Sequence, residues 1–227
     1  MLSAVIFDFN GIIVDDEPIH FELFQRVLKE QGIRLTEQDY YARYLGFDDR
    51  GAFTAAYREQ GRPINEKALA KLIQRKAVYY QEAIRNKTRV FPGVKTLVPE
   101  LAQKLPLAIA SGALRNEIDA ILANINLKQH FRAVVSAEDV TEGKPEPQIF
   151  LKALSKLNAV PDGRRAIEAG ECLVIEDSRE GIRGARRAGM KCLAVANSHP
   201  PAELREADAV VKSLEEVSLT FLQGMFS

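Results

Sequence analysis

Four short polar segments of the chain combine residue types that can do chemistry together. Three of them directly follow short apolar runs, and the fourth precedes an expected helix. In chain order they are Asp8-Phe9-Asn10-Gly11, Ser111-Gly112, Gly143-Lys144-Pro145 and Glu176-Asp177-Ser178. Together they supply a nucleophilic carboxylate, a hydroxyl, a fixed cation and an acidic pair. Phosphoryl transfer requires such a set, because its catalysis consists of positioning and of neutralising the developing charge.

The acidic residues predict a nucleophile and a metal site. Asp8 lies at the end of the first apolar run, where its carboxylate could attack phosphorus in line. Mg²⁺ prefers oxygen ligands and keeps several waters, so few protein ligands suffice. We expect these to be Asp8, the backbone carbonyl of Asn10 and Asp177, with Glu176 nearby.

The remaining polar residues predict the groups that would hold a phosphoryl group. Lys144 would bind it and balance the carboxylates. Ser111 and Gly112 lie just before an expected helix. The Ser111 hydroxyl and the backbone amides that follow it would donate hydrogen bonds to phosphoryl oxygens.

Each of these segments is weak as a signal on its own. A strand-end Asp is often a turn residue, Ser-Gly is often a helix N-cap, and Gly-Lys-Pro is often a solvated turn. Glu176-Asp177 is more informative, because adjacent acids directly after an apolar strand are electrostatically costly without a cation or a basic partner.

Composition limits the classes of protein that the chain can belong to. Its 227 residues are 46% hydrophobic, enough for a full core, and Lys plus Arg equals Asp plus Glu at 31 each. A balanced charge argues against a nucleic-acid-binding protein. Cys172 and Cys192 lie in apolar runs and form no metal framework, which favours a reduced, cytoplasmic setting. We expect a soluble, unexported protein without a membrane span or a membrane partner.

Apolar runs alternate with helical patterns over most of the chain, which predicts an α/β fold with a doubly wound parallel sheet. The expected strands are Ala4 to Phe7, Leu107 to Ala110, Cys172 to Ile175, Cys192 to Ala196 and Ala209 to Val211. The expected helices are Val94 to Lys104, Arg115 to Ile125, Pro147 to Leu157 and Arg179 to Ala188.

Residues from about Pro18 to Asn86 break this alternation, since they carry amphipathic helix patterns without a convincing strand. We therefore predict an inserted helical cap. Two apolar stripes should form its core: Ile19, Leu23, Phe24, Val27 and Leu28, then Leu69, Leu72, Ile73, Ala77, Tyr80 and Ile84.

The ordered motifs resemble the haloacid dehalogenase superfamily, in particular its capped phosphatases similar to beta-phosphoglucomutase and phosphoglycolate phosphatase. The first motif with the cap entry is FDFNGIIVDDEPIH, and the others are IASGA, GKPEPQIF and VIEDSREGIRGARRAGM. The resemblance covers nearly the whole chain. It implies a Rossmann-like core at residues 1–16 and 88–227, a small helical cap at residues 17–87, Mg²⁺ dependence and an aspartyl-phosphate at Asp8.

Substrate specificity in capped members comes from cap residues that face the site. By position, the candidates here are His20, the Gly46-Phe47-Asp48-Asp49-Arg50 loop and Lys76. A packed or hinge-bonded His20, and solvated Arg50 and Lys76, are the competing interpretations. If Arg50 and Lys76 do face inward, a second anionic group on the substrate becomes plausible.

The sequence departs from the family pattern at Asn10, where members normally carry an aspartate that acts as general acid and base. An amide cannot transfer the proton, although its backbone carbonyl still can bind a metal. Three interpretations remain open: a working enzyme with a relaxed need for an acid, a weak or inactive relative, and a substitution introduced to trap a complex. Deamidation of the Asn10-Gly11 pair could restore an acid in part of a sample.

We expect a magnesium-dependent phosphatase that acts, as a monomer, on a small phosphorylated metabolite such as a phosphosugar. A mutase similar to beta-phosphoglucomutase is one alternative. A catalytically weakened protein that only binds a phosphometabolite is another, and Asn10 is its only support.

Overall fold

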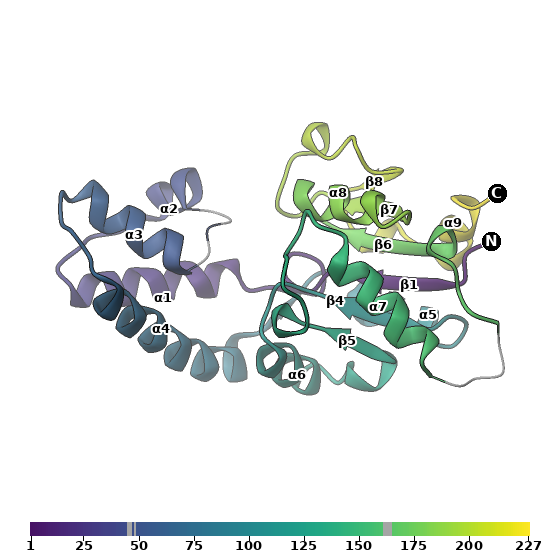
Figure 1. Cartoon of the computed structure of the whole chain (residues 1–227), viewed down its shortest axis with the longest axis horizontal. Helices are drawn as coiled ribbons and strands as arrows, with labels where there is room; N and C mark the ends of the chain where they lie inside the picture. Colours follow the sequence, from purple (N-terminus) through teal and green to yellow (C-terminus); the bar gives the residue numbers. More distant parts are fainter. Residues whose placement is uncertain (45–46, 48, 161–164) are drawn as a thin grey trace. The chain divides into compact units, whose positions relative to one another are not determined.

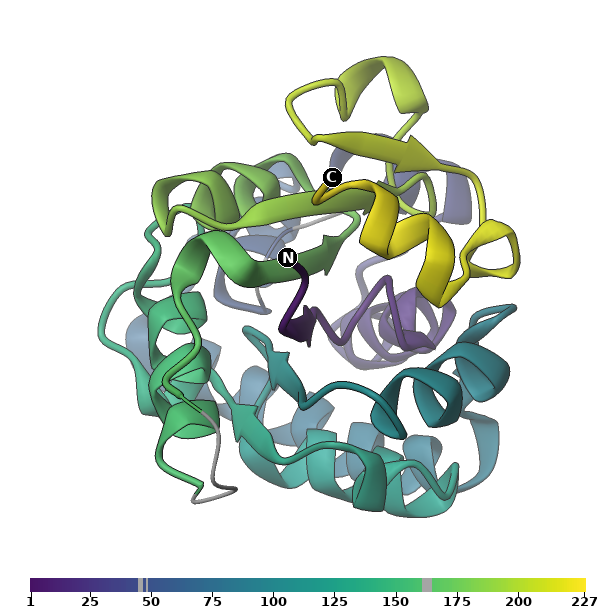
Figure 2. The same ribbon diagram turned by 90° about the vertical axis from the view of Figure 1, so that its right-hand side faces the viewer.

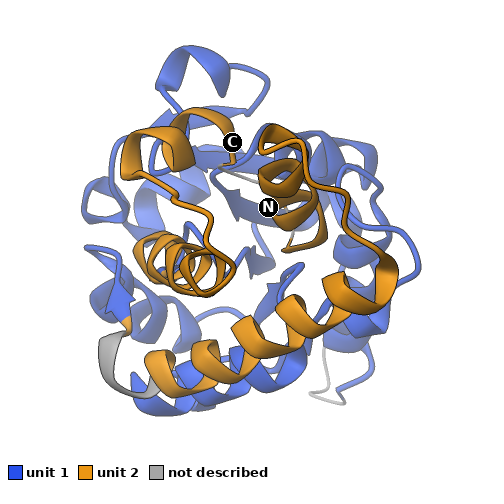
Figure 3. Cartoon of the chain, turned by 90° about the vertical axis from the view of Figure 1, so that its left-hand side faces the viewer, with its two compact units in different colours: residues 1–15, 89–227 blue, residues 16–88 orange. Residues whose placement is uncertain are grey.

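The computed structural model describes residues 1–44, 47, 49–160 and 165–227, and only the backbone of residues 85–87. The chain divides into two compact units, residues 1–15 with 89–227, and residues 16–88 (Figure 3). The first unit is an α/β core and the second is helical. No helix among the described residues is long and apolar enough to cross a membrane.

The α/β core contains a six-stranded sheet in the order β5-β4-β1-β6-β7-β8, and every neighbouring pair in it is parallel (Figure 1). The central strands are buried along their whole length, as expected for a parallel sheet covered on both faces. The strands are β1 (Ala4–Phe7), β4 (Leu107–Ala110), β5 (Ala133–Val135), β6 (Cys172–Glu176), β7 (Lys191–Val195) and β8 (Ala209–Val211).

Helices cover both faces of this sheet. Side chains of α7 and α8 form one apolar layer with alternate residues of the strands, while α5 and α9 lie on the opposite face (Figures 1 and 2). The helices of the core are α5 (Val94–Ala102), α6 (Arg115–Asn124), α7 (Gln148–Asn158), α8 (Arg179–Arg187) and α9 (Leu219–Gly224). Single 3-10 turns are η1 (Lys128–His130), η2 (Ala137–Asp139), η3 (Ala169–Glu171), η4 (Pro201–Glu203) and η5 (Leu214–Glu216).

The predicted α/β class and the predicted strands are confirmed, and their ends differ by at most one residue. The structure adds three short strands that the sequence did not reveal. β5 has only three residues, and β2 (Val14–Asp15) pairs antiparallel with β3 (Arg89–Val90) in a separate ribbon. Apolar runs of two or three residues are too short to give a periodic signal, so tertiary pairing decides them.

The helical unit contains α1 (Glu17–Glu30), α2 (Glu37–Arg43), α3 (Asp49–Glu59) and α4 (Glu66–Lys87). Thr36 and Asn65 cap α2 and α4 by accepting backbone N–H hydrogen bonds. The predicted stripe of α1 is buried in full. On α4, residues Leu69, Leu72, Tyr80 and Ile84 are buried. This unit therefore has an apolar core of its own.

Candidate active site

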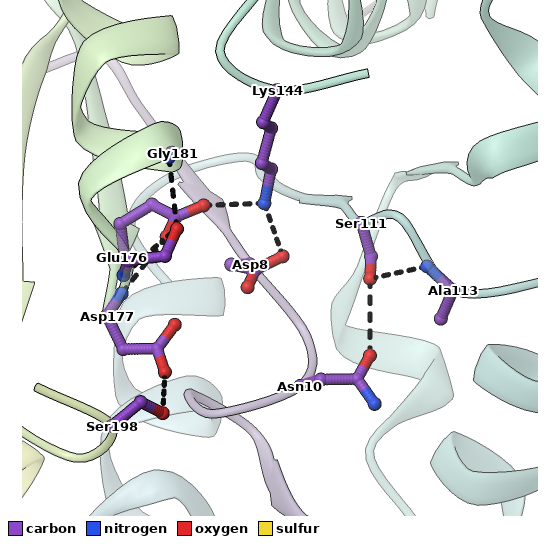
Figure 4. A network of polar contacts seen from close by, with 10 residues as sticks. Asp8, Asn10, Ser111, Ala113, Lys144, Glu176, Asp177, Gly181 and Ser198 are labelled. Atoms are coloured by element: carbon purple, nitrogen blue, oxygen red, sulfur yellow. Dashed lines mark hydrogen bonds and ion pairs between the residues drawn. The ribbon is translucent and has the colours of Figure 1, made fainter. Parts of the chain in front are cut away.

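The carboxyl ends of three adjacent strands bring most of the predicted site residues together (Figure 4). Phe7 of β1 pairs with Ile109 of β4 on one side and with Ile175 of β6 on the other. Because parallel strands end at the same edge of the sheet, the residues that follow them meet there. Asp8, Ser111 and the pair Glu176 and Asp177 are all buried at this edge.

Lys144 lies between two of the carboxylates. Its Nζ donates a hydrogen bond of 2.6 Å to Asp8 Oδ1 and one of 2.5 Å to Glu176 Oε1. Only 14% of its side chain is exposed. Burial alone would lower the pKa of Lys144, but the two carboxylates outweigh burial and raise it. The two carboxylates therefore favour the charged form of Lys144, which comes from a loop outside the sheet.

Glu176 has both carboxylate oxygens engaged within the protein. Oε1 accepts from Lys144, and Oε2 accepts from the backbone N–H groups of Asp177 and Ser178 and from the Ser178 hydroxyl. A Cβ at position 181 would lie 1.9 Å from the Glu176 Cδ, so Gly181 of α8 leaves the room that this carboxylate occupies. Glu176 is thus a fixed acceptor that orients Lys144.

The nucleophile candidate Asp8 is buried among these charges. Burial raises its pKa to about 7, Lys144 opposes that rise and Glu176 adds to it. A carboxylate whose charge is so poorly solvated favours a nearby cation. Protonation of Asp8 would remove the negative charge that both nucleophilic attack and metal binding use.

The segment that follows β7 donates hydrogen bonds to Asp177 and to the neighbouring backbone of Gly11. Ser198 Oγ donates a hydrogen bond to Asp177 Oδ2, and Asn197 Nδ2 donates one of 2.6 Å to the carbonyl oxygen of Gly11. Gly11 has a φ of 79°, and a Cβ there would lie 1.9 Å from Asp177 Oδ2. Burial, and next the neighbouring carboxylates, raise the pKa of Asp177 well above its usual value.

Three acids are close enough to share one cation. Ligand oxygens of Asp8, Glu176 and Asp177 lie within 4.8 Å of one another, and all three side chains are buried. Oxygen donors of this kind suit Mg²⁺ or another hard cation. Lys144 balances part of their charge, while burial, followed by the neighbouring carboxylates, raises the pKa of Asp8 and of Asp177. The residues present therefore fit a divalent cation.

Ser111 and Asn10 form the other side of the site. Ser111 Oγ accepts a hydrogen bond of 3.1 Å from the Ala113 N–H and lies 3.5 Å from Asn10 Oδ1, to which it donates. Gly112 is exposed, and a Cβ there would meet nothing within 4 Å. This side of the site is therefore exposed at Gly112.

The helical unit contains a polar cluster that includes His20, Lys76 and Asp49, all of which are predicted substrate residues. Lys76 is buried, and its Nζ donates to Asp49 at 2.5 Å and lies 2.8 Å from His20 Nδ1. His20 Nε2 contacts Asp16 at 3.1 Å, and Tyr80 donates to the same carboxylate oxygen at 2.6 Å. A solvated Lys76 is therefore wrong, while the hydrogen-bonded interpretation of His20 agrees with these contacts.

Arg50 follows Asp49 of that cluster in the chain and has an ion-pair partner outside it. It forms an exposed ion pair of 2.7 Å with Glu66. Of the loop that the sequence singled out, Phe47 is exposed, whereas Gly46 and Asp48 lie outside the described residues. The structure does not bring Arg50 and Lys76 into one site among the contacts that it describes.

Sequence reasoning missed three polar residues that contact the site or its loops, namely Asn197, Ser198 and Gln148. Asn197 and Ser198 come within three residues of the end of β7, so the strand-end rule that found Asp8 could have found them. Gln148 begins α7 and binds the loop that carries Lys144. No spacing signal indicates that side chain-to-backbone contact.

Known proteins resemble this chain over almost its full length. It is 30% identical to the Phosphorylated carbohydrates phosphatase of Thermotoga maritima, covering 98% of this chain and 99% of that protein. It is 28% identical to the Beta-phosphoglucomutase of Bacillus subtilis, covering 97% and 94%. The crystal structure of CbbY from Rhodobacter sphaeroides in complex with phosphate shares the fold, with a TM-score of 0.82 at 21% identity over 98% and 100% of the two chains.

A family match covers the strand ends described above. Residues 5–195 match the family of haloacid dehalogenase-like hydrolases. That span contains Asp8, Ser111, Lys144, Glu176 and Asp177. The chain belongs to the haloacid dehalogenase-like hydrolase family.

Proposed function

We propose that this phosphoric monoester hydrolase is a magnesium-dependent phosphatase of a small phosphorylated metabolite, and that Asp8 forms an aspartyl-phosphate intermediate. The single observation that carries the proposal is the Lys144 ammonium between Asp8 and Glu176 beside Asp177. One cation and three acids in a buried site suit phosphoryl transfer far better than a structural core.

In this proposal the bond to the leaving oxygen breaks as Asp8 Oδ attacks phosphorus. Lys144 offsets charge on the carboxylates and the phosphoryl oxygens. The Ser111 hydroxyl and the Gly112 amide donate to those oxygens. Bound Mg²⁺ would act as a Lewis acid, held by Asp8, the Asn10 carbonyl and Asp177. We assign Glu176 to Lys144 rather than to the metal, because both its oxygens already accept hydrogen bonds.

Asn10 limits what this site can do. Its amide can donate a hydrogen bond but cannot protonate a leaving group or deprotonate water, tasks that contribute about 10²–10⁴-fold where an acid or base performs them. The proposal therefore includes slow turnover on simple alkyl phosphates. Turnover of substrates with good leaving groups, such as acyl phosphates, would be reduced less, because such groups leave without protonation.

The similarity to a beta-phosphoglucomutase favours a mutase as the second candidate. A mutase would use the same nucleophile and return the phosphoryl group to a sugar. Incubation with a hexose 1-phosphate and Mg²⁺ tests the choice. Free phosphate supports the phosphatase, and hexose 6-phosphate without free phosphate supports the mutase.

A protein that binds a phosphometabolite without turnover is the third candidate, and Asn10 favours it. A hydrolysis screen over phosphosugars, phosphoglycolate and acyl phosphates tests it, with beryllofluoride binding as the control. Beryllofluoride binding without turnover on any compound would refute the phosphatase. We also propose a cytoplasmic, monomeric protein, in keeping with two buried free thiols.

A further inference from the structure

Lys144 reaches the site from a loop rather than from a strand end. This loop spans residues 140–147, between η2 and α7, and Thr141, Glu142 and Gly143 in it are exposed. A lysine side chain carries about 2 kcal/mol of rotamer entropy, and a mobile backbone would add to the disorder of its ammonium. Something must therefore hold this loop if Nζ is to stay within 2.6 Å of Asp8.

Gln148, the first residue of α7, supplies the contacts that hold it. Its Oε1 accepts hydrogen bonds from the backbone N–H groups of Thr141 at 2.8 Å and Glu142 at 3.0 Å. The Thr141 hydroxyl lies 3.3 Å from the same oxygen and 3.2 Å from Gln148 Nε2. One amide side chain thus ties the start of the loop to the helix that follows it.

The turn that carries Lys144 is closed on itself within this tied loop. The Glu146 N–H donates a 3.0 Å hydrogen bond to the Gly143 carbonyl, so Lys144 lies inside a single tight turn. On its far side the turn contacts α8, where a Cβ at Gly184 would lie 3.4 Å from the Pro145 carbonyl oxygen. The turn is therefore fixed between Gln148 and α8.

Arg187 of α8 also contacts this loop, but its contacts are exposed, and one of them is a long hydrogen bond of 3.4 Å to the Pro145 carbonyl oxygen. Arg187 forms a 2.6 Å ion pair with Glu146, but the two side chains are 52% and 45% exposed. Exposed pairs of this kind contribute little to stability. Gln148 is half-buried and accepts from two backbone amides at once, so it is the stronger anchor.

We propose that Gln148 is a positioning residue that holds the Lys144 ammonium between Asp8 and Glu176 through the backbone of residues 141 and 142. The role in catalysis rests on the proposed phosphatase function, whereas the positioning of Lys144 does not. Gln148 acts through Lys144 and has no contact with Asp8, Glu176 or Asp177 among the hydrogen bonds of the described residues.

The test compares Gln148→Leu, Gln148→Glu and the control Gln129→Leu in the full chain. Leucine lacks both the oxygen and the nitrogen of the glutamine amide. Glutamate keeps an oxygen that can accept hydrogen bonds from the backbone N–H groups of Thr141 and Glu142. Gln129 is an exposed glutamine of η1, which precedes β5 and so lies toward the opposite end of the sheet from the site. Thermal melts establish that each variant is folded.

The first measurement is trace acetylation of metal-free protein with acetic anhydride, read by peptide mass spectrometry. The rate at Lys144 is normalised to that at exposed Lys128. Loss of two hydrogen bonds should raise the Lys144 rate about 5- to 100-fold in Gln148→Leu. Gln148→Glu and Gln129→Leu should label as the unchanged protein does. A Lys144 rate in Gln148→Leu no higher than in the control would overturn the proposal.

The second measurement is kcat and KM for p-nitrophenyl phosphate with Mg²⁺. Displacement of Lys144 in Gln148→Leu should lower kcat by about 10- to 100-fold, with a smaller change in KM. Gln148→Glu should keep most of the kcat of the unchanged protein. Equal losses in the Leu and Glu variants would contradict positioning, because the Glu variant keeps the acceptor. If the unchanged protein fails to hydrolyse any phosphate ester, the proposed function fails, and acetylation alone still decides whether Gln148 positions Lys144.

Discussion

Replacing Lys144 by methionine should destabilise the metal-free protein strongly, and more so at high pH. The side chain is 14% exposed and lies 2.6 Å from Asp8 and 2.5 Å from Glu176. Without it, acids whose oxygens lie within 4.8 Å of one another lose their cation. Two like charges at that separation repel by about 3.5 kcal/mol at an effective dielectric constant of about 20. Breaking a buried ion pair by removing one partner typically costs about 3–5 kcal/mol.

The pH dependence follows from the direction of the Asp8 shift. Burial raises the pKa of Asp8 to about 7 in the folded protein, above its unfolded value near 3.8. The folded state therefore holds its proton more tightly, so the metal-free protein loses stability as pH rises through that interval. Lys144 limits this loss by lowering the pKa of Asp8. Removal of Lys144 should therefore lower the free energy of unfolding most at pH 8. The decrease should be clearly smaller at pH 6, where Asp8 takes up a proton.

Urea denaturation in EDTA at both pH values measures this effect. Lys128→Met is the matched control, because Lys128 forms a surface pair with Asp119 in which its own side chain is 57% exposed. We expect the control to change the free energy of unfolding by less than about 1 kcal/mol. If Lys144→Met lowers the free energy of unfolding by less than about 1 kcal/mol at pH 8, or by equal amounts at pH 6 and pH 8, this account of the buried charges is refuted.

Three further predictions concern the missing acid at position 10, the metal site and Asp139 of η2. Asn10→Asp should raise turnover on simple alkyl phosphates by about 10²–10⁴-fold, because it supplies a general acid; unchanged turnover in a folded, magnesium-saturated variant would refute this. Ser198→Ala should weaken Mg²⁺ binding by about 10–100-fold in calorimetry, since Ser198 orients Asp177; an unchanged dissociation constant would show that Ser198 has no such role. Burial would raise the pKa of Asp139, but hydrogen bonds from Ser136 and Lys156 lower it well below its usual value. Its stabilisation is therefore present in full above the unfolded pKa and lost only as pH falls through the lower folded pKa. Asp139→Asn should therefore lower the urea midpoint more at pH 7 than at pH 2, and equal shifts at both pH values would contradict this.

Strand ends were predictable because buried parallel strands leave a plain signal. Residues 4–7 and 172–175 are unbroken apolar runs followed at once by acids, and the rule that ligands bind beyond the carboxyl ends of strands then selects Asp8 and Asp177. The helical insertion was predictable as well, since its apolar stripes repeat with helical spacing over α1 and α4.

Contacts made by loops were not predictable in the same way. The placement of Lys144 depends on Gln148 and on close approach by α8, neither of which has a sequence period. Lys76 is a further case, because a lysine on an amphipathic helix is usually solvated. Here it is buried beside Asp49 and His20, with its ammonium 4.0 Å from the ring centre of Phe24.

Asn10 determines which step of the proposed reaction should limit turnover. The water that clears an aspartyl-phosphate needs a base, and the amide of Asn10 is not one. Once formed, the adduct at Asp8 should therefore persist longer than in a site with a carboxylate at position 10. That persistence makes the adduct accessible to direct detection.

The most direct test of the central claim is the detection of a phosphoryl group on Asp8. The protein is mixed with acetyl phosphate and Mg²⁺, quenched rapidly in acid and mapped by peptide mass spectrometry, with Asp8→Asn treated in parallel. We predict one phosphoryl group on the peptide that contains Asp8 and none in the variant. A phosphoryl group on another residue, or turnover by Asp8→Asn equal to that of the unchanged protein, would contradict the assignment of Asp8 as the nucleophile.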